Sequence, residues 1–133
     1  MSTEDTNAAC RGSGSNDLLG LAPERVDIGL LQAAAQAAGL RVVRWDGDGH
    51  AFRVLDDQAS TFSLWNPLTD DGDALRLAVM LEMDIGQMLT EGCVTVTALG
   101  ADSDVYAHDV PWGTDPLAAT RRAIVLVAAD MAN

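Results

Sequence analysis

The chain has 133 residues, of which 48% are hydrophobic and 5% aromatic, so we expect one compact domain with a mainly aliphatic core. It carries 20 acidic and 8 basic residues, every base is an arginine, and the formal net charge is −12. This charge argues against direct binding to nucleic acid or to an anionic membrane, because both partners are themselves negative.

The excess of acid lies in the middle of the chain, since Arg76 is the only base between Val54 and Asp115. Cys10 and Cys93 are too few and too far apart to predict a disulfide framework. No apolar run reaches the ~18–20 residues of a membrane span, and the first residues lack a secretion signal pattern. We therefore predict a cytoplasmic protein.

The first residues predict a leader followed by a helix. Residues 1–16 are polar and have no hydrophobic period, which is typical of disorder, so the single domain is assigned to residues 17–133. Pro23 suits the first turn of a helix that runs to Ala38, and Gly39 can take the left-handed conformation that ends it.

A β-hairpin is predicted next. Residues 40–46 have the composition of a strand, the DGDG sequence at 46–49 is a turn signal, and residues 50–56 form a return strand. The segment 56–61 is predicted as a loop.

The second half of the domain begins with a helix from Asp70 to Met83. Its predicted buried stripe is Ala74, Leu77, Ala78 and Leu81, with Leu75 as a further member. Residues 83–89 fit a strand or a loop, whereas 93–99 alternate as a strand does and 105–110 form another strand.

The last helix is predicted from Asp115 to Met131, with Asp115 as N-cap and Pro116 in the first turn. Leu117, Arg121, Ile124, Ala128 and Met131 share one stripe. The predicted order is α-β-β-α-β-β-α. The fold class is α+β: an antiparallel or mixed sheet of about four strands with three helices packed on it.

The acidic segment TDDGD at 69–73 has two interpretations. A calcium loop of the EF-hand type fails, because placing Gly72 at its sixth position puts Pro67 at the first and Ala78 at the twelfth. A helix start fits better, since Asp70 can cap the first turn and Asp73 can complete a capping box. Carboxylates at that helix end would also repel phosphate.

Other residues carry little chemical signal. A thiol triad of Cys93, His108 and Asp109 has no local support, and no cofactor or metal site is predicted. Trp residues are either core anchors or contacts of a partner surface. The partner-binding candidates combine acids and tryptophans: Asp56, Asp57, Asp70, Asp71, Asp73, Trp65 and Trp112.

Two motifs carry a resemblance, WNPLTDDGDALRLAV at 65–79 and DPLAATRRAIV at 115–125. Together with the Gly-ended helix before them they resemble small accessory proteins of tailed phages and prophages, and loosely the phage αβα-sandwich domains. The resemblance covers residues 24–131. It implies a phage context and a fold, but no activity and no catalytic residues.

We therefore expect a non-enzymatic phage or prophage protein that binds a host or phage protein with a basic surface. An acidic inhibitor of a host defence protein is the sharper form, in which carboxylates on one face imitate nucleic acid. The alternatives are a metal-dependent hydrolase or nuclease that uses Asp70, Asp71 and Asp73, and a self-associating structural or assembly protein.

Overall fold

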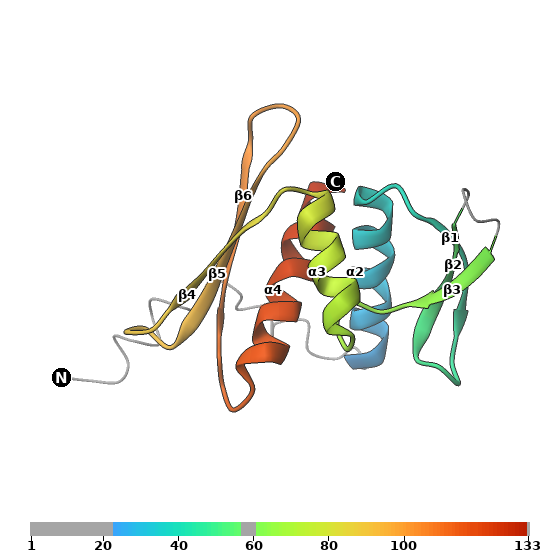
Figure 1. Ribbon diagram of the computed structural model, residues 1–133, viewed down its shortest axis with the longest axis horizontal. Helices are drawn as coiled ribbons and strands as arrows, with labels where there is room; N and C mark the ends of the chain where they lie inside the picture. The colour runs from blue at the N-terminus through green and yellow to red at the C-terminus, as the bar shows by residue number, and fades with distance from the viewer. Residues whose placement is uncertain (1–22, 57–60, 133) are drawn as a thin grey trace.

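The computed structural model describes residues 23–56 and 61–132. Three helices stand in the centre, with one three-stranded antiparallel sheet on each side (Figure 1). The observed order is α-β-β-β-α-β-β-β-α. No helix in these two ranges is long and apolar enough to cross a membrane.

Sheet A consists of strands β1 (Arg41–Asp46), β2 (Ala51–Asp56) and β3 (Thr61–Trp65), with β2 in the middle. The carboxylate of Asp46 accepts the backbone N–H groups of Asp48 and Gly49 at 3.0 and 3.2 Å and so closes the β1–β2 turn. This is a typical Asx turn, in which an aspartate replaces a backbone acceptor.

Sheet B consists of β4 (Asp84–Met88), β5 (Cys93–Leu99) and β6 (Val105–Pro111), with β5 in the middle. Successive side chains of a strand point to opposite faces. Val94 and Val96 of β5 are therefore both fully buried on the face that packs against the last helix.

The helices are α2 (Pro23–Ala37), α3 (Asp71–Met80) and α4 (Pro116–Met131). Helix α4 is central, because it packs against α2, α3, β5 and β6. Buried alanines of α2 and α4 allow the two helices to approach closely. The guanidinium of Arg122 in α4 also lies 3.3 Å from the carboxylate of Asp27 in α2.

The α+β class is confirmed, and so is the left-handed cap at Gly39, whose φ is 73°. The predicted count of about four strands in one sheet is too low, because the described residues form six strands in two sheets. The segment 61–65 pairs with β2, and the segment 83–89, which fitted a strand or a loop, contains β4. The predicted leader at 1–16 lies outside the described residues.

Two leucines of the helically spaced stripes lie at the surface. Leu75 of α3 is 61% exposed and Leu117 of α4 is 62% exposed. Of the other predicted α3 positions, Ala74, Leu77 and Ala78 are buried, whereas Leu81 is half-buried and follows the last helical residue. Leu75 and Leu117 line the same groove.

Candidate functional site

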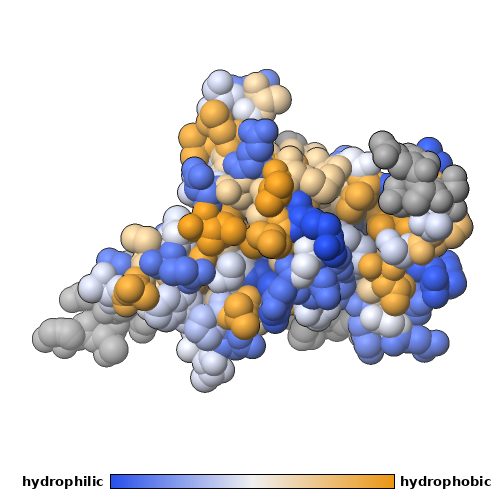
Figure 2. All heavy atoms as spheres, viewed as in Figure 1, coloured by the Kyte–Doolittle hydropathy of each residue, from blue (hydrophilic) through white to orange (hydrophobic). Residues whose placement is uncertain are grey.

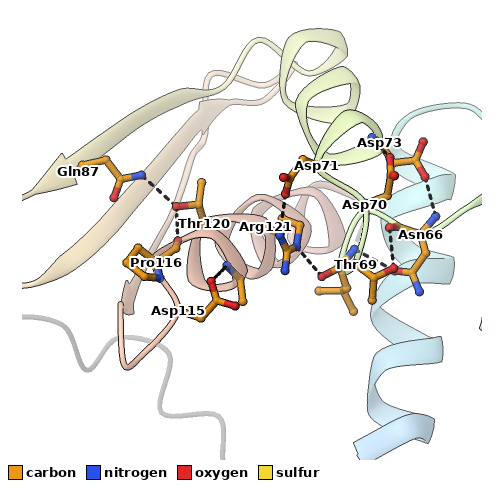
Figure 3. A network of polar contacts seen from close by, with 12 residues as sticks. Asn66, Thr69, Asp70, Asp71, Asp73, Gln87, Asp115, Pro116, Thr120 and Arg121 are labelled. Atoms are coloured by element: carbon orange, nitrogen blue, oxygen red, sulfur yellow. Dashed lines mark hydrogen bonds and ion pairs between the residues drawn. The ribbon is translucent and has the colours of Figure 1, made fainter.

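The acidic start of α3 is a network of helix caps (Figure 3). Asp70 is the N-cap, and its carboxylate accepts the N–H of Asp73 at 2.8 Å. Asp73 in turn accepts the N–H of Asn66 at 2.9 Å and a bond from Arg76 at 2.8 Å. The reciprocal partner of Asp73 is therefore Asn66, four residues before the N-cap, and not the cap residue of a standard capping box.

Asn66 holds this helix start against sheet A. Its side chain is buried, its Nδ2 donates to the carbonyl of His50 at 2.6 Å, and its Oδ1 accepts the N–H of Leu68 at 2.9 Å. A buried amide with both ends bonded fixes the chain on either side of it. Asn66 thus joins the end of β3 to the first turn of α3.

Asp71 faces a different element. Its carboxylate pairs with the Nη1 of Arg121 at 2.6 Å, and the Nε of Arg121 donates to the carbonyl of Leu68 at 2.8 Å. The Arg121 side chain is only 17% exposed, so this double attachment ties α4 firmly to the start of α3.

Each of the three carboxylates proposed for a metal has donors of the chain as partners. Asp70 accepts the backbone N–H of Asp73 and shares Arg76 with Asp73, whereas Asp71 bonds an arginine of α4. Within the described ranges, no group of three or more His, Cys, Asp or Glu could hold a metal ion. The local contacts explain these acids as parts of the fold.

The remaining candidates are dispersed. Asp56 ends β2, but its side chain and the whole of Asp57 lie outside the described residues. Trp65 is 7% exposed and belongs to the core, so its ring is not open to a partner. Trp112 is half-buried, and its Nε1 donates to Gln87 of β4 at 2.8 Å.

The hypothesis of a thiol triad of Cys93, His108 and Asp109 is wrong. Cys93 is 1% exposed and disulfide-bonded, so its sulfur is not a nucleophile, whereas Cys10 lies outside the described residues. His108 bonds Asp130 of α4 at 2.6 Å, while Asp109 bonds Thr95 on the other face of sheet B. A disulfide was not predicted, and it is typical of oxidising compartments.

Some exposed acids of the described residues lie in turns that are far apart. Asp48 lies in the β1–β2 turn and Asp102 and Asp104 lie in the β5–β6 turn, and Figure 1 shows these turns at opposite ends of the molecule. The α3 start lies between them in the chain and in space.

The sequence did not point to an apolar groove where α3, β4 and α4 meet. We call it the α3–β4 groove; it is lined chiefly by Leu75, Ile85, Leu117 and Ile124, with Asp71 and Arg121 at one side. Figure 2 shows hydrophobic side chains gathered on this face of the molecule. The sequence signal for this groove is the last turn of α3, in which every residue is apolar. A helix turn without a polar residue has no side suited to face water.

A second pocket, of about 550 Å³, lies between sheet A and α3. Leu40, Val54, Leu64 and Met80 contribute to its wall, together with the Asp73–Arg76 ion pair. The helices pack less extensively on sheet A than on sheet B.

Comparisons of the chain with protein families, with curated proteins and with solved structures found no match.

Proposed function

We propose that the protein is a non-enzymatic accessory protein of a phage or prophage, and that it acts by binding a host or phage protein with a basic surface. The phage context rests on the two motifs described above, at 65–79 and 115–125. The proposal includes action in the host cytoplasm, and the disulfide at Cys93 is the feature that counts against that compartment.

The observation that carries the proposal is the way in which the charges pair. Four arginines are occupied by acids of the same chain: Arg53 by Asp46, Arg76 by Asp70 and Asp73, Arg121 by Asp71, and Arg122 by Asp27. The acids that remain exposed without an ion pair among the described residues include Asp48, Glu82, Asp84, Asp102 and Asp104.

These acids leave the surface with a negative potential that the chain itself does not neutralise. Such a potential attracts basic partners and speeds their encounter. An inhibitor of a host defence protein is one form of this activity, provided that the target offers a basic surface. Because the acids are spread, we expect them to steer and orient the partner and expect apolar contacts to hold it.

The test is affinity capture from a lysate of the host bacterium at low salt (about 50 mM) and at high salt (about 500 mM), because exposed charges are screened within this range. A matched variant neutralises the five exposed acids by Asp→Asn and Glu→Gln exchange. We expect a basic protein to be enriched by the native chain, and to be reduced by high salt and by the variant. Equal capture by both chains, or none by the native chain, would contradict the proposal.

A further inference from the structure

Strand β3 is an edge strand without the features that keep edge strands from pairing further. It pairs with β2 along one side, and within residues 23–56 and 61–132 no strand pairs with its other side. Its sequence, TFSLW, has no charge and no proline, its register with β2 is regular, and its first four residues are exposed. An exposed edge of this kind is a template for one more strand.

The other three edge strands of the two sheets are protected. Strand β1 carries arginines and has an irregular register between Val42 and Arg44. Strand β4 begins at Asp84, and β6 contains Asp109 and ends at Pro111. Charges, prolines and bulges on an edge oppose pairing with another chain. The open edge is therefore a property of β3 in particular.

The backbone groups along β3 determine the chemistry of the ligand. An antiparallel strand directs the N–H and C=O groups of alternate residues to one neighbour, so the intervening residues of β3 direct theirs away from β2. A row of backbone donors and acceptors at this spacing is matched by another extended polypeptide. A helix cannot match it, because its own backbone groups are bonded to one another.

Apolar side chains flank this edge on both faces of sheet A. On one face, Phe62 and Leu64 are 57% and 47% exposed. Since successive side chains of a strand alternate, Ser63 points to the other face, where the pocket of about 550 Å³ is walled by Leu77 and Met80 of α3. A strand added beside β3 would place one set of its side chains in this pocket and the other set beside Phe62 and Leu64.

The charges near the end of β3 favour a basic residue in the added strand. A smaller pocket beside Trp65 is also lined by Asp70, Asp73 and Arg76, so it contains two carboxylates and one guanidinium. The side chain of Asp70 is 59% exposed, and its carboxylate lies 4.0 Å from Arg76. A second copy of the chain would instead bring −12 against −12, so a basic segment of a partner is favoured over self-association.

We propose that the open edge of β3 binds an extended segment of a partner protein, which adds to sheet A as a fourth strand, with alternate apolar side chains and a basic residue near Asp70. This inference rests on the proposed function and names the surface and the partner conformation that it uses. Strand addition takes its affinity from backbone hydrogen bonds and its specificity from alternate side chains.

The probe is a synthetic peptide of about nine residues, with alternating valine and threonine and an arginine at each end. Two N-methylated forms lack the N–H of every second residue, one at the valines and the other at the threonines. In calorimetry with the full chain, one form should bind at least about tenfold more weakly than the peptide, and the other nearly as well as the peptide. Because both forms have the same charge, general attraction to an acidic protein cannot produce this difference.

Amide exchange followed by NMR locates the bound peptide. The outward N–H groups of β3 should exchange rapidly in the free chain and at least about tenfold more slowly in the complex, because they gain carbonyl partners. The outward N–H groups of β1, at the opposite edge of sheet A, should exchange equally fast in both states.

A pair of lysine variants tests the edge itself. Phe62→Lys with Leu64→Lys should lower the affinity about tenfold, because lysines on an edge strand oppose pairing. Leu99→Lys with Val105→Lys, a similarly exposed cross-strand pair of β5 and β6, changes the net charge by the same amount and should have little effect.

A second pair of variants tests the basic residue of the ligand. Asp70→Asn keeps a side-chain acceptor at the N-cap and should lower the affinity for the peptide a fewfold at low salt. Asp102→Asn, in the distant β5–β6 turn, removes the same charge and should not.

Four results would overturn the assignment. They are no binding of the peptide, equal affinities of the two N-methylated forms, equal losses in the two lysine variants, and β3 amides already protected in the free chain, which would mean that the chain covers its own edge. A dimer in sedimentation that Phe62→Lys with Leu64→Lys dissolves would likewise place a second copy there in place of a partner.

The capture experiment separates this inference from the function. If the native chain and the Phe62→Lys, Leu64→Lys variant retain the same basic protein, the function stands and the β3 edge is the wrong surface. If the native chain retains none, the function itself fails.

Discussion

Sheets A and B have the same strand number and the same antiparallel order, yet they are packed differently. The middle strand of sheet B places Val94 and Val96 fully inside against α4. In sheet A the apolar side chains are divided between both faces, with Phe52 and Val54 inside and Phe62 and Leu64 largely exposed. A pocket of about 550 Å³ separates part of sheet A from α3.

The difference shows that the pairing of strands and the burial of their side chains vary independently between the two sheets. In both sheets the neighbouring strands are paired in an antiparallel ladder. Sheet A buries Phe52 and Val54 to 4% and 5% exposure, whereas Val94 and Val96 of sheet B are completely buried. Such burial is the larger source of stability. Sheet A depends more on specific polar contacts, of which Asn66 provides the main one at the end of β3.

The largest expected effect compares two valines in the middle strands. Val96→Ala should lower the free energy of unfolding by about 2–3 kcal/mol, because it leaves a cavity among close-packed neighbours. Val54→Ala should cost about 1 kcal/mol, because Val54 already borders a pocket. Urea denaturation measures both changes. Equal losses would mean that the two sheets are equally well packed.

The junction of sheet A with α3 is expected to be nearly as sensitive. Asn66→Ala should cost about 2 kcal/mol, because it leaves the carbonyl of His50 and the N–H of Leu68 without their partner. Asn66→Asp keeps the acceptor for Leu68 but places a buried carboxylate oxygen against the carbonyl of His50, so it should be more harmful at neutral pH. Thermal unfolding of the three chains checks the order. A variant as stable as the native chain would show that Asn66 does not hold the junction.

The acidic start of α3 should show a smaller, structural effect. Asp70→Ala removes the N-cap bond to Asp73 and should cost about 1 kcal/mol, as losses of helix caps do. Addition of Mg²⁺, Mn²⁺ or Ca²⁺ should leave the melting temperature of the native chain unchanged. A rise that Asp70→Ala abolishes would restore the metal-dependent alternative.

The smallest expected effect concerns pH and the β1–β2 turn of sheet A. The N–H of Gly49, with that of Asp48 and the Arg53 guanidinium, holds the pKa of Asp46 below its ordinary value of 3.8, against an opposing effect of desolvation. A lowered folded-state pKa gives stability that is present above pH 3.8 and is lost as the pH falls through the folded value. NMR titration of the carboxyl carbon measures that pKa directly.

Asp46→Asn provides the matching stability measurement. The variant should be slightly less stable than the native chain at neutral pH, and the difference should disappear at an acid pH below the lowered pKa of Asp46, where the native carboxyl is protonated. The same difference at both pH values would show that the charge of Asp46 is not what the turn uses.

The helices could be predicted to within a few residues because local signals mark their ends. Asp70 and Asp115 were predicted as N-caps and both accept a first-turn N–H. Strand β3 was missed although Thr61 to Leu64 alternates between polar and apolar residues, because five residues are a short signal. Its apolar residues Phe62 and Leu64 lie on the exposed face. Composition also cannot tell which strands share a sheet, so six strands in two sheets were read as about four in one.

The candidate site was less predictable for a physical reason. Hydrophobic periodicity reports that a residue is apolar at a helical spacing, but it cannot tell whether the covering surface belongs to the same chain. Leu75 and Leu117 therefore had the pattern of core residues. Arg121 shares the helical stripe of Leu117. Its contacts with Asp71 and with the backbone carbonyl of Leu68 join residues at least fifty positions apart, so they follow only from the tertiary structure.

The attachment of Arg121 to the start of α3 has a consequence for the order of folding. The two residues that it binds are made about fifty positions earlier, and Arg122 beside it pairs with Asp27, 95 positions earlier. During synthesis both sheets can form as local hairpins, but α2 and α3 gain their main packing surface only when α4 leaves the ribosome. The core therefore closes late, and contacts this distant in sequence are slow to form. Until then, the apolar faces that will meet α4 remain open to chaperones.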